Sequence, residues 1–205
     1  NIFWNAIDNI EAAGAVMIFA AGNEGQCGAA SIRNPANRIT SELNAFCVGM
    51  VDARTDIINP PVDALSSFGP SDCNGSTVKP ELVAPGVNLL TTTVPGGLTP
   101  QAYGTSFSTP LVAAAVALLR EYNPNATADQ IKQALLTGAR DLGTAGPDNQ
   151  YGHGILNVVA ALRALPANTQ PSIAVRESYY TRPTPGQSAQ VVLNLKNSGT
   201  AATNV

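Results

Sequence analysis

The sequence predicts an α/β fold built on a mainly parallel sheet. Short apolar runs bounded by glycine, such as residues 16–21, are typical of strands that are buried on both faces of a sheet. Helical periodicity precedes this run and is separated from it by Gly14, as in half of a βαβ unit. Residues 111–119 are all Leu, Val or Ala, which predicts a helix buried on every side.

Composition narrows the possible classes of protein. The chain has 205 residues, of which 12% are charged, and its formal net charge is −3. This length supports one good core, or one core and part of a second. The lack of a basic stripe argues against nucleic-acid binding, and the longest apolar run is too short for a membrane span. Because the sequence starts at Asn1 inside an expected helix and shows no signal peptide, we expect a fragment of a longer protein.

The elements of the first half follow from periodicity and chain breakers. Apolar residues at helical spacing from Phe3 onward predict a helix that Gly14 ends. A buried strand at residues 16–21 leads into a loop that extends to residue 44. Further β-prone runs lie at residues 45–51, 64–68, 82–84 and 87–93, and Gly96-Gly97 marks a turn.

The second half is helical before its composition changes. Asn123-Pro124 stops the apolar helix, and Thr127-Ala128-Asp129-Gln130 is a capping box that starts an amphipathic helix ending near Gly138. A last helix is expected at residues 155–165. Residues 166–171 are expected to be a linker, and the loose alternation in 172–205 indicates the start of a β-sandwich-like segment.

The turn Gly104-Thr105-Ser106 delivers a serine to the start of the apolar helix. Backbone N–H groups at a helix N-terminus are unpaired, and the helix macrodipole is positive there. Both effects stabilise the negative charge that develops when a serine nucleophile attacks an acyl group. Taken alone, the stretch favours the simpler interpretation that Ser106 or Ser108 is an N-cap.

Asn23 follows the predicted strand at residues 16–21, within a Gly-rich loop. Sites in open α/β sheets form at the carboxyl ends of strands, and an Asn amide can donate a hydrogen bond there. Taken alone, Asn beside Gly more simply indicates a tight turn. If the apolar helix packs against this strand, the Asn23 amide and the Ser106 N–H can point at one oxygen, which would form an oxyanion hole beside a nucleophile.

Several segments together resemble the signature segments of the subtilisin-like serine proteases (subtilases), in order and in spacing. They are Ala20-Ala21-Gly22-Asn23-Glu24-Gly25, Ser66-Ser67-Phe68-Gly69-Pro70, Lys79-Pro80-Glu81-Leu82-Val83-Ala84-Pro85-Gly86-Val87, Gly104-Thr105-Ser106-Phe107-Ser108-Thr109-Pro110 and Tyr151-Gly152-His153-Gly154-Ile155-Leu156-Asn157. The resemblance is greatest for bacillopeptidase-type secreted members. It implies a three-layer α/β/α subtilisin-like fold whose N-terminal part is missing. Residues 1–165 would be the C-terminal part of the catalytic domain, and residues 172–205 a truncated accessory domain.

The resemblance also implies roles for single residues. Ser106 matches the nucleophile of a serine endopeptidase, and Asn23 matches the oxyanion-hole asparagine. The substrate would be an extended polypeptide bound by backbone pairing. The segment Ala20-Ala21-Gly22 would form one wall of the primary specificity pocket, with Glu24 near its rim. The family likeness, together with the low charge, favours a secreted, extracellular protein.

The chain departs from the family in the rest of the catalytic triad. The Asp and His segments of the family are absent and would lie before Asn1. The one histidine, His153, falls in the closing turn and matches a structural position rather than the general base. Because a serine without a base is a weak nucleophile, we predict that this chain alone is inactive. The missing N-terminal half of the catalytic domain would be its partner.

The sequence also bears on metal binding, on disulfide pairing and on an alternative function. Calcium is frequent in the family, but no Asp/Glu cluster with ligand spacing is visible, so we predict no metal site and no cofactor. Cys27 and Cys73 lie in Gly-rich loops and form the more plausible disulfide, the alternative being that one of them bonds to sequence outside this chain, whereas Cys47 is expected to be a buried thiol. The alternative to an enzyme is a non-catalytic subtilase homologue that acts as a binding or adhesion module.

Overall fold

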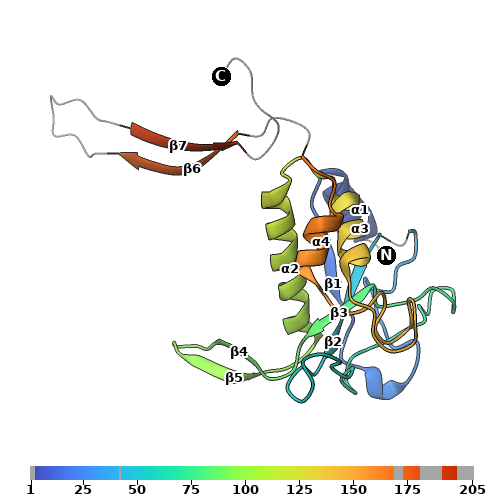
Figure 1. The fold of residues 1–205 in the computed structure, drawn as a ribbon. Coiled ribbons are helices and arrows are strands. Elements are labelled where there is room, and N and C mark those ends of the chain that lie inside the picture. Colours follow the sequence, from blue (N-terminus) through green and yellow to red (C-terminus); the bar gives the residue numbers. More distant parts are fainter. Residues whose placement is uncertain (1–2, 42, 169–172, 181–190, 198–205) are drawn as a thin grey trace.

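A parallel sheet of three strands lies at the centre of the fold (Figure 1). Its strands are β1 (Ile18–Ala20), β2 (Phe46–Val51) and β3 (Leu82–Pro85), in the order β1-β2-β3. The structure, a computed structural model, describes residues 3–41, 43–168, 173–180 and 191–197, the last two ranges by their backbone alone. Parallel strands and the helices around them confirm the predicted α/β class.

Alternation along β2 creates two apolar layers, because successive side chains of a strand point to opposite faces. Phe46 and Val48 join the main core, while Cys47 between them joins a smaller cluster with Ile32 and Ala36. All of β2 is buried, which confirms the strand expected at residues 45–51 and the buried thiol.

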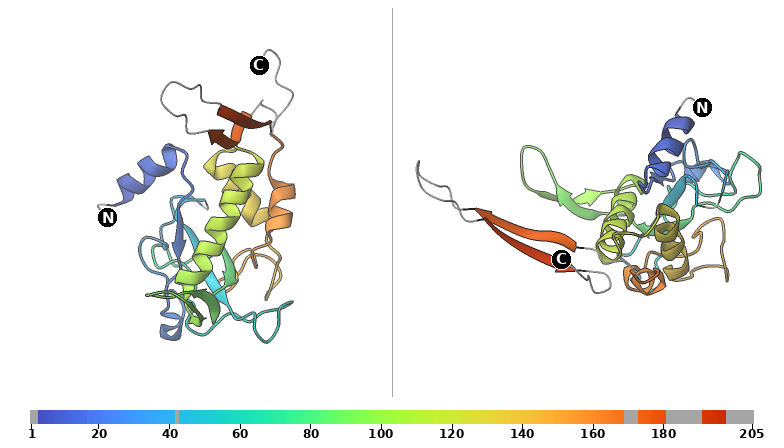
Figure 2. Two further views of the ribbon diagram at one scale, coloured as in Figure 1. Left: turned by 90° about the vertical axis from the view of Figure 1, so that its left-hand side faces the viewer. Right: turned by 90° about the horizontal axis from the view of Figure 1, so that it is seen from above.

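Most of the helices lie on one face of the sheet. The helices α2 (Thr105–Tyr122), α3 (Ala128–Gly138) and α4 (Val158–Ala164) pack on one face, and α1 (Trp4–Ala12) lies on the other side of the sheet from α2 (Figure 2). The main core between sheet and helices includes Phe46, Val48, Leu82, Ala84, Val112, Ala115, Leu119, Ile131, Leu135 and Ala161.

Local signals in the sequence set several helix ends correctly. Gly14 has a φ of 93° and follows the end of α1. At the start of α3, the Thr127 hydroxyl accepts from the Gln130 N–H at 3.1 Å and the Gln130 side chain accepts from the Thr127 N–H at 2.8 Å. These reciprocal bonds confirm the predicted capping box. The last helix is shorter than the predicted 155–165, because Asn157 caps it and Ile155 instead bridges to Val83 and Arg140.

Two strand predictions need correction. Residues 64–68 are not a strand: the Asp63 carboxylate accepts from the Leu65 N–H at 2.9 Å, and this turn prevents an extended ladder. The strand expected at 16–21 is shorter, and its side chains are only partly buried. Within the described residues β1 is an edge strand of its sheet, so one long side of it has no neighbouring strand.

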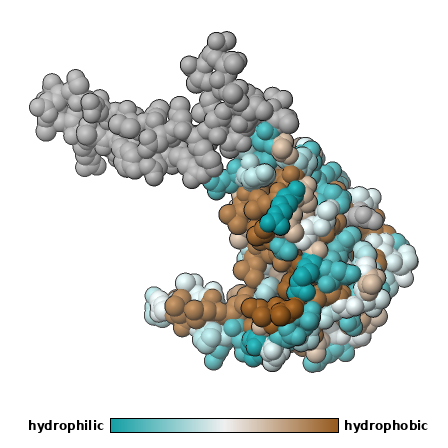
Figure 3. Space-filling view, viewed as in Figure 1, coloured by the Kyte–Doolittle hydropathy of each residue, from teal (hydrophilic) through white to brown (hydrophobic). Residues whose placement is uncertain are grey.

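The prediction that residues 111–119 are buried on every side is wrong. Val112, Ala115 and Leu119 are buried against the sheet and the other helices. On the opposite face Leu111 is 39% exposed and Leu118 is 51% exposed. Figure 3 shows the apolar surface that this face of α2 adds to the molecule. The pattern therefore predicted an apolar helix correctly, but in the part of the chain that the structure describes, other residues pack against only one face of this helix.

A projecting hairpin connects β3 to α2 (Figure 1). Its strands β4 (Leu89–Thr92) and β5 (Leu98–Ala102) pair antiparallel around the expected glycine turn. The strand β4 confirms the β-prone run at 87–93, whereas β5 was not predicted. In the tail, β6 (Ile173–Tyr180) and β7 (Val191–Asn197) also pair antiparallel. The remainder of the predicted accessory segment lies outside the described residues.

All cysteines of the chain are free thiols, so the expected bond between Cys27 and Cys73 is not formed; both residues are exposed. Among the helices that the structure describes, none combines the length and the apolar character that a membrane crossing requires. Within the same part of the chain, no group of three or more His, Cys, Asp or Glu side chains is arranged to hold a metal ion.

Candidate functional site

The turn before α2 places Ser106 at an exposed helix start. Gly104, with a φ of 132°, is the N-cap residue, and its N–H donates to the Gly86 carbonyl at 2.9 Å. Ser106 is thus the second residue of α2, and the N-cap residue Gly104 has no side chain that could cap the helix. The interpretation of Ser106 or Ser108 as an N-cap is therefore wrong. The Ser108 hydroxyl is buried and donates to the Thr105 carbonyl at 2.9 Å.

Asn23 reaches this turn from the carboxyl end of β1. Its Oδ1 accepts from the Thr105 N–H at 3.0 Å and from the Thr105 hydroxyl at 3.1 Å. Because a backbone N–H can only donate, the amide atom that faces it must be oxygen. The other amide atom, Nδ2, keeps its protons for a further acceptor. The helix start therefore packs against the strand end, which is the condition on which the expected oxyanion hole depends.

Thr105 is the functional residue that sequence reasoning missed. It is fully buried, and its hydroxyl also contacts the backbone of Gly22, accepting from the N–H at 3.2 Å and lying 3.3 Å from the carbonyl. The single hydroxyl proton is shared between the Gly22 carbonyl and the Asn23 amide oxygen. The available signal was a hydroxyl residue directly before the serine, in a turn otherwise made of small residues.

The resulting arrangement favours negative charge in one place. The Asn23 amide group lies close to Gly104, since a Cβ added to Gly104 would be 3.2 Å from Nδ2. The Ser106 N–H belongs to the first turn of α2, where N–H groups have no acceptor within the helix. An 18-residue helix also directs the positive end of its dipole to this spot. Asn23 and Ser106, both exposed, therefore lie at the same end of α2, where the helix dipole favours negative charge.

Glu24 folds back over the same loop. Its backbone N–H donates to the Ser67 hydroxyl at 3.0 Å, and that hydroxyl donates to the Glu24 carboxylate at 3.0 Å. A Cβ at Gly22 would lie 2.4 Å from this carboxylate, so Gly22 leaves the space that Glu24 occupies. Of the other predicted wall residues, Ala20 is partly exposed, while Ala21 packs into the small cluster with Cys47 and offers no exposed side chain.

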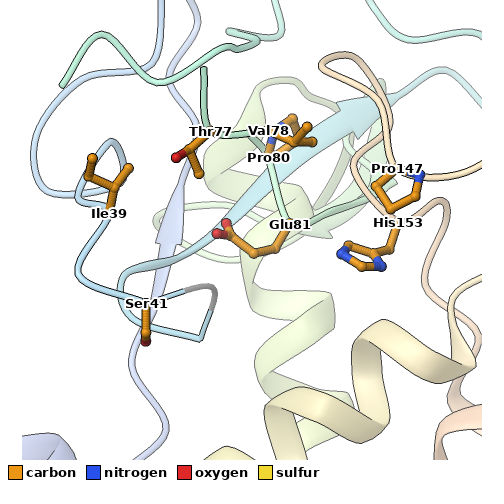
Figure 4. Close-up of a pocket in the computed structure, with 8 residues that line it drawn as sticks. All are labelled: Ile39, Ser41, Thr77, Val78, Pro80, Glu81, Pro147 and His153. Carbon is orange, nitrogen blue, oxygen red and sulfur yellow. The ribbon is translucent and has the colours of Figure 1, made fainter. Parts of the chain in front are cut away.

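His153 lies at a different place. It lines a cavity of about 350 Å³ with Glu81 and Thr77 (Figure 4). Its backbone N–H donates to the Glu81 carbonyl at 2.8 Å, inside a turn whose glycines, Gly152 and Gly154, have positive φ. The structure therefore places this histidine in the turn that the sequence assigned to it.

The carboxylate of Glu81 forms a buried ion pair that supports the sheet behind the site. Its two oxygens accept from the Lys79 ammonium at 2.5 Å and from the Cys47 N–H at 2.6 Å. Lys79 also donates to the Ala45 carbonyl at 3.2 Å. Burial outweighs these bonds and raises the pKa of Glu81 from 4.5 to about 7. Burial likewise raises the pKa of the Cys47 thiol.

An apolar groove lies between β1 and α2, beginning within one helical turn of Ser106. Its volume is about 440 Å³. The residues that line it are Val16, Met17, Ile18, Thr109, Pro110, Ala113 and Val116. The groove adjoins the partly buried edge strand β1 and one side of α2.

Comparison with known proteins adds independent information. Residues 2–154 match the model of the subtilase family. The chain is 34% identical over 169 residues to bacillopeptidase F of Bacillus subtilis (strain 168), covering 79% of this chain and 11% of that protein. It is also 34% identical over 158 residues to subtilisin BL of Lederbergia lenta, covering 77% of this chain and 50% of the relative.

A solved structure, that of the prenylagaramide maturation protease PagA, superposes with a TM-score of 0.61 at 26% identity. The match covers 79% of this chain and 55% of the other. The chain therefore spans about half, or less, of the length of these proteins.

Proposed function

This chain belongs to the subtilase family, and on that premise we propose that it is the nucleophile-bearing part of a serine endopeptidase. One observation carries the proposal. The Asn23 amide oxygen accepts from Thr105, the residue immediately before Ser106, and this contact brings the Asn23 side chain to the turn that carries the serine. Acyl transfer requires hydrogen-bond donors beside the nucleophile, and the Asn23 amide nitrogen and the Ser106 N–H are proposed for that role.

The proposed reaction passes through an acyl-enzyme. The Ser106 Oγ bonds to the carbonyl carbon of the peptide, and the Oγ proton moves to a histidine base. Asn23 Nδ2 and the Ser106 N–H donate to the oxyanion that forms. The C–N bond then breaks as the histidine returns the proton to the leaving amine. Water, activated by the same base, finally releases the acyl group from Ser106.

We assign the base and its orienting aspartate to residues that precede Asn1 in the complete protein. Support comes from the length of the relatives, about twice the matched region in subtilisin BL. Further support comes from the groove between β1 and α2, which is mainly apolar and begins at Thr109, within one helical turn of the serine. A preceding domain half that filled this groove and paired with β1 would also cover the exposed face of α2.

The proposed substrate is an extended polypeptide, and the proposed location is outside the cell. Ala20 and Gly22 would form part of the primary pocket, with the Glu24 carboxylate at its rim. An acidic rim disfavours acidic side chains, so Glu24→Gln should improve cleavage after Glu relative to cleavage after Lys. If the complete wild-type protein and this variant show the same ratio of cleavage after Glu to cleavage after Lys, Glu24 does not lie at the rim of the pocket.

The experiment that tests the function is a peptidase assay of the complete protein. Casein and short chromogenic peptides should be hydrolysed, and Ser106→Ala should reduce hydrolysis to background. Ser76→Ala, at an exposed loop position, is the matched control and should retain wild-type activity. Peptide binding without hydrolysis by the wild-type protein would favour the non-catalytic binding module instead.

A further inference from the structure

The turn that carries Ser106 is fixed at a third point besides Gly104 and Thr105. The hydroxyl of Tyr103 donates to the Asp63 carboxylate at 2.5 Å, across 40 residues of sequence. Tyr103 joins the end of β5 to the N-cap of α2 and is 39% exposed. Any movement of this turn relative to the sheet must therefore break or stretch the bond to Asp63.

Hydrogen bonds other than the one from Tyr103 hold Asp63 in place. Its backbone N–H donates to the Met50 carbonyl of β2 at 3.2 Å, and its own carbonyl accepts from the Ser66 N–H at 2.9 Å. The same carboxylate oxygen that binds Tyr103 also accepts from the Leu65 N–H at 2.9 Å. The acceptor is thus oriented by the turn of residues 63–66 and needs little ordering to bind the hydroxyl.

The segment 63–67 also contacts the loop that carries Asn23. The Leu65 carbonyl accepts from the Gly25 N–H at 3.0 Å, and the Ser67 N–H donates to the Gly22 carbonyl at 3.0 Å. One segment of loop therefore touches both sides of the candidate oxyanion hole. On one side it holds the residues around Asn23, and on the other side it holds the turn before Ser106.

The charges around Tyr103 keep its hydroxyl a donor. Burial, the hydrogen bond to Asp63 and the negative charges of Asp63 and Asp52 disfavour a phenolate, and they outweigh the opposite effect of Arg54, so the pKa of Tyr103 rises to about 12. Arg54 is itself engaged by Asp52 through two side-chain contacts, at 2.8 Å and 2.7 Å. The hydroxyl therefore stays protonated over the whole range in which a serine peptidase operates.

We propose that Tyr103 is a positioning residue, which fixes the Ser106 turn to the segment 63–67 through Asp63 and so sets the serine against Asn23. This assignment rests on the proposed peptidase function for its catalytic consequence. The other part of the assignment, that the hydroxyl restrains the turn, does not depend on the peptidase function. Loss of the bond widens the range of positions that the serine occupies, and a small misplacement of a nucleophile slows the chemical step more than it weakens binding.

The test compares Tyr103→Phe with the wild type in the complete protein. We expect kcat to fall by about tenfold with KM within about twofold. Amide hydrogen exchange in a peptide that spans residues 103–108 should accelerate. Tyr122→Phe, at the exposed far end of α2, is the matched control and should change neither quantity. Asp63→Asn keeps an amide oxygen that can accept from Tyr103 and Leu65, so it should retain more activity than Tyr103→Phe.

The two readouts separate this proposal from the proposed function. Unchanged kcat in Tyr103→Phe would overturn the positioning role, and so would a loss of kcat without faster exchange. A wild-type protein without peptidase activity would refute the proposed function. In that case faster exchange in Tyr103→Phe would still support the restraint on the turn, and unchanged exchange would overturn it.

Discussion

Thr105 binds the amide oxygen of Asn23 twice, through its backbone N–H at 3.0 Å and its hydroxyl at 3.1 Å. The two residues are 82 positions apart in the sequence. The double contact fixes both the position of the amide and the identity of its two end atoms. The nitrogen is thereby left to donate beside Ser106, at the positive end of α2.

Removing the Asn23 donor should slow catalysis strongly. We expect Asn23→Ala to lower kcat of the complete protein by a factor of the size known for oxyanion-hole donors, about 10² to 10³. Asn23→Asp keeps the oxygen that Thr105 binds but lacks the donor nitrogen. It should lose at least as much activity, and near wild-type kcat in this variant would show that the nitrogen donates nothing to the reaction.

Removing the Thr105 hydroxyl should act through Asn23. Thr105→Val preserves shape but leaves the amide oxygen with one donor, so we expect kcat to fall by roughly tenfold, the equivalent of one hydrogen bond. Thr105→Ser restores the hydroxyl and should recover most of this loss. Steady-state kinetics check both variants, and equal kcat values for them would contradict the role of the hydroxyl.

A methyl group at Gly104 should disturb the site directly. Its Cβ would lie 3.2 Å from Asn23 Nδ2, and the φ of 132° adds backbone strain. Gly104→Ala should therefore lower both kcat and the melting temperature. Gly146→Ala is the matched control, because Gly146 has a φ of 83° with nothing within 4 Å of the added Cβ. It should lower the melting temperature alone; an equal loss of kcat in the two variants would argue against contact with Asn23.

The buried Glu81 should make stability depend on pH. Its pKa is raised to about 7, so between about pH 4.5 and 7 the folded state holds a proton that the unfolded chain has lost. The stabilisation is full below pH 4.5 and is lost as the pH rises through 7, by up to about 1.4 kcal/mol per pH unit. The unfolding free energy of Glu81→Gln relative to wild type should increase across this window. A pH-independent difference in urea unfolding would contradict the raised pKa.

The sequence predicted those parts of the fold and site that depend on local pattern. Asn23 was assigned to a strand end and Ser106 to a helix start from local pattern, and the two were expected to form a site if the helix packs against the strand. The start of a helix at Thr127 and the end of another at Gly14 could likewise be predicted, because each signal acts within one helical turn.

What the sequence could not predict depends on distant contacts. Residues 64–68 have a strand-like composition, but the Asp63 turn and the bonds to Gly22 and Gly25 hold them as a loop. The role of Thr105 appears only once Asn23 is packed against it. The exposure of Leu118 on an apolar helix depends on which neighbours are present, and composition alone carries no information about them.

The most direct test of the central claim is to treat the protein with a fluorophosphonate probe and locate the adduct by mass spectrometry. We expect a single adduct on Ser106 in the complete protein, absent from Ser106→Ala. We also expect no labelling of the isolated residues 1–205, which lack the base. A complete protein that remains unlabelled, or that is labelled at another serine, would contradict the assignment of Ser106 as the nucleophile.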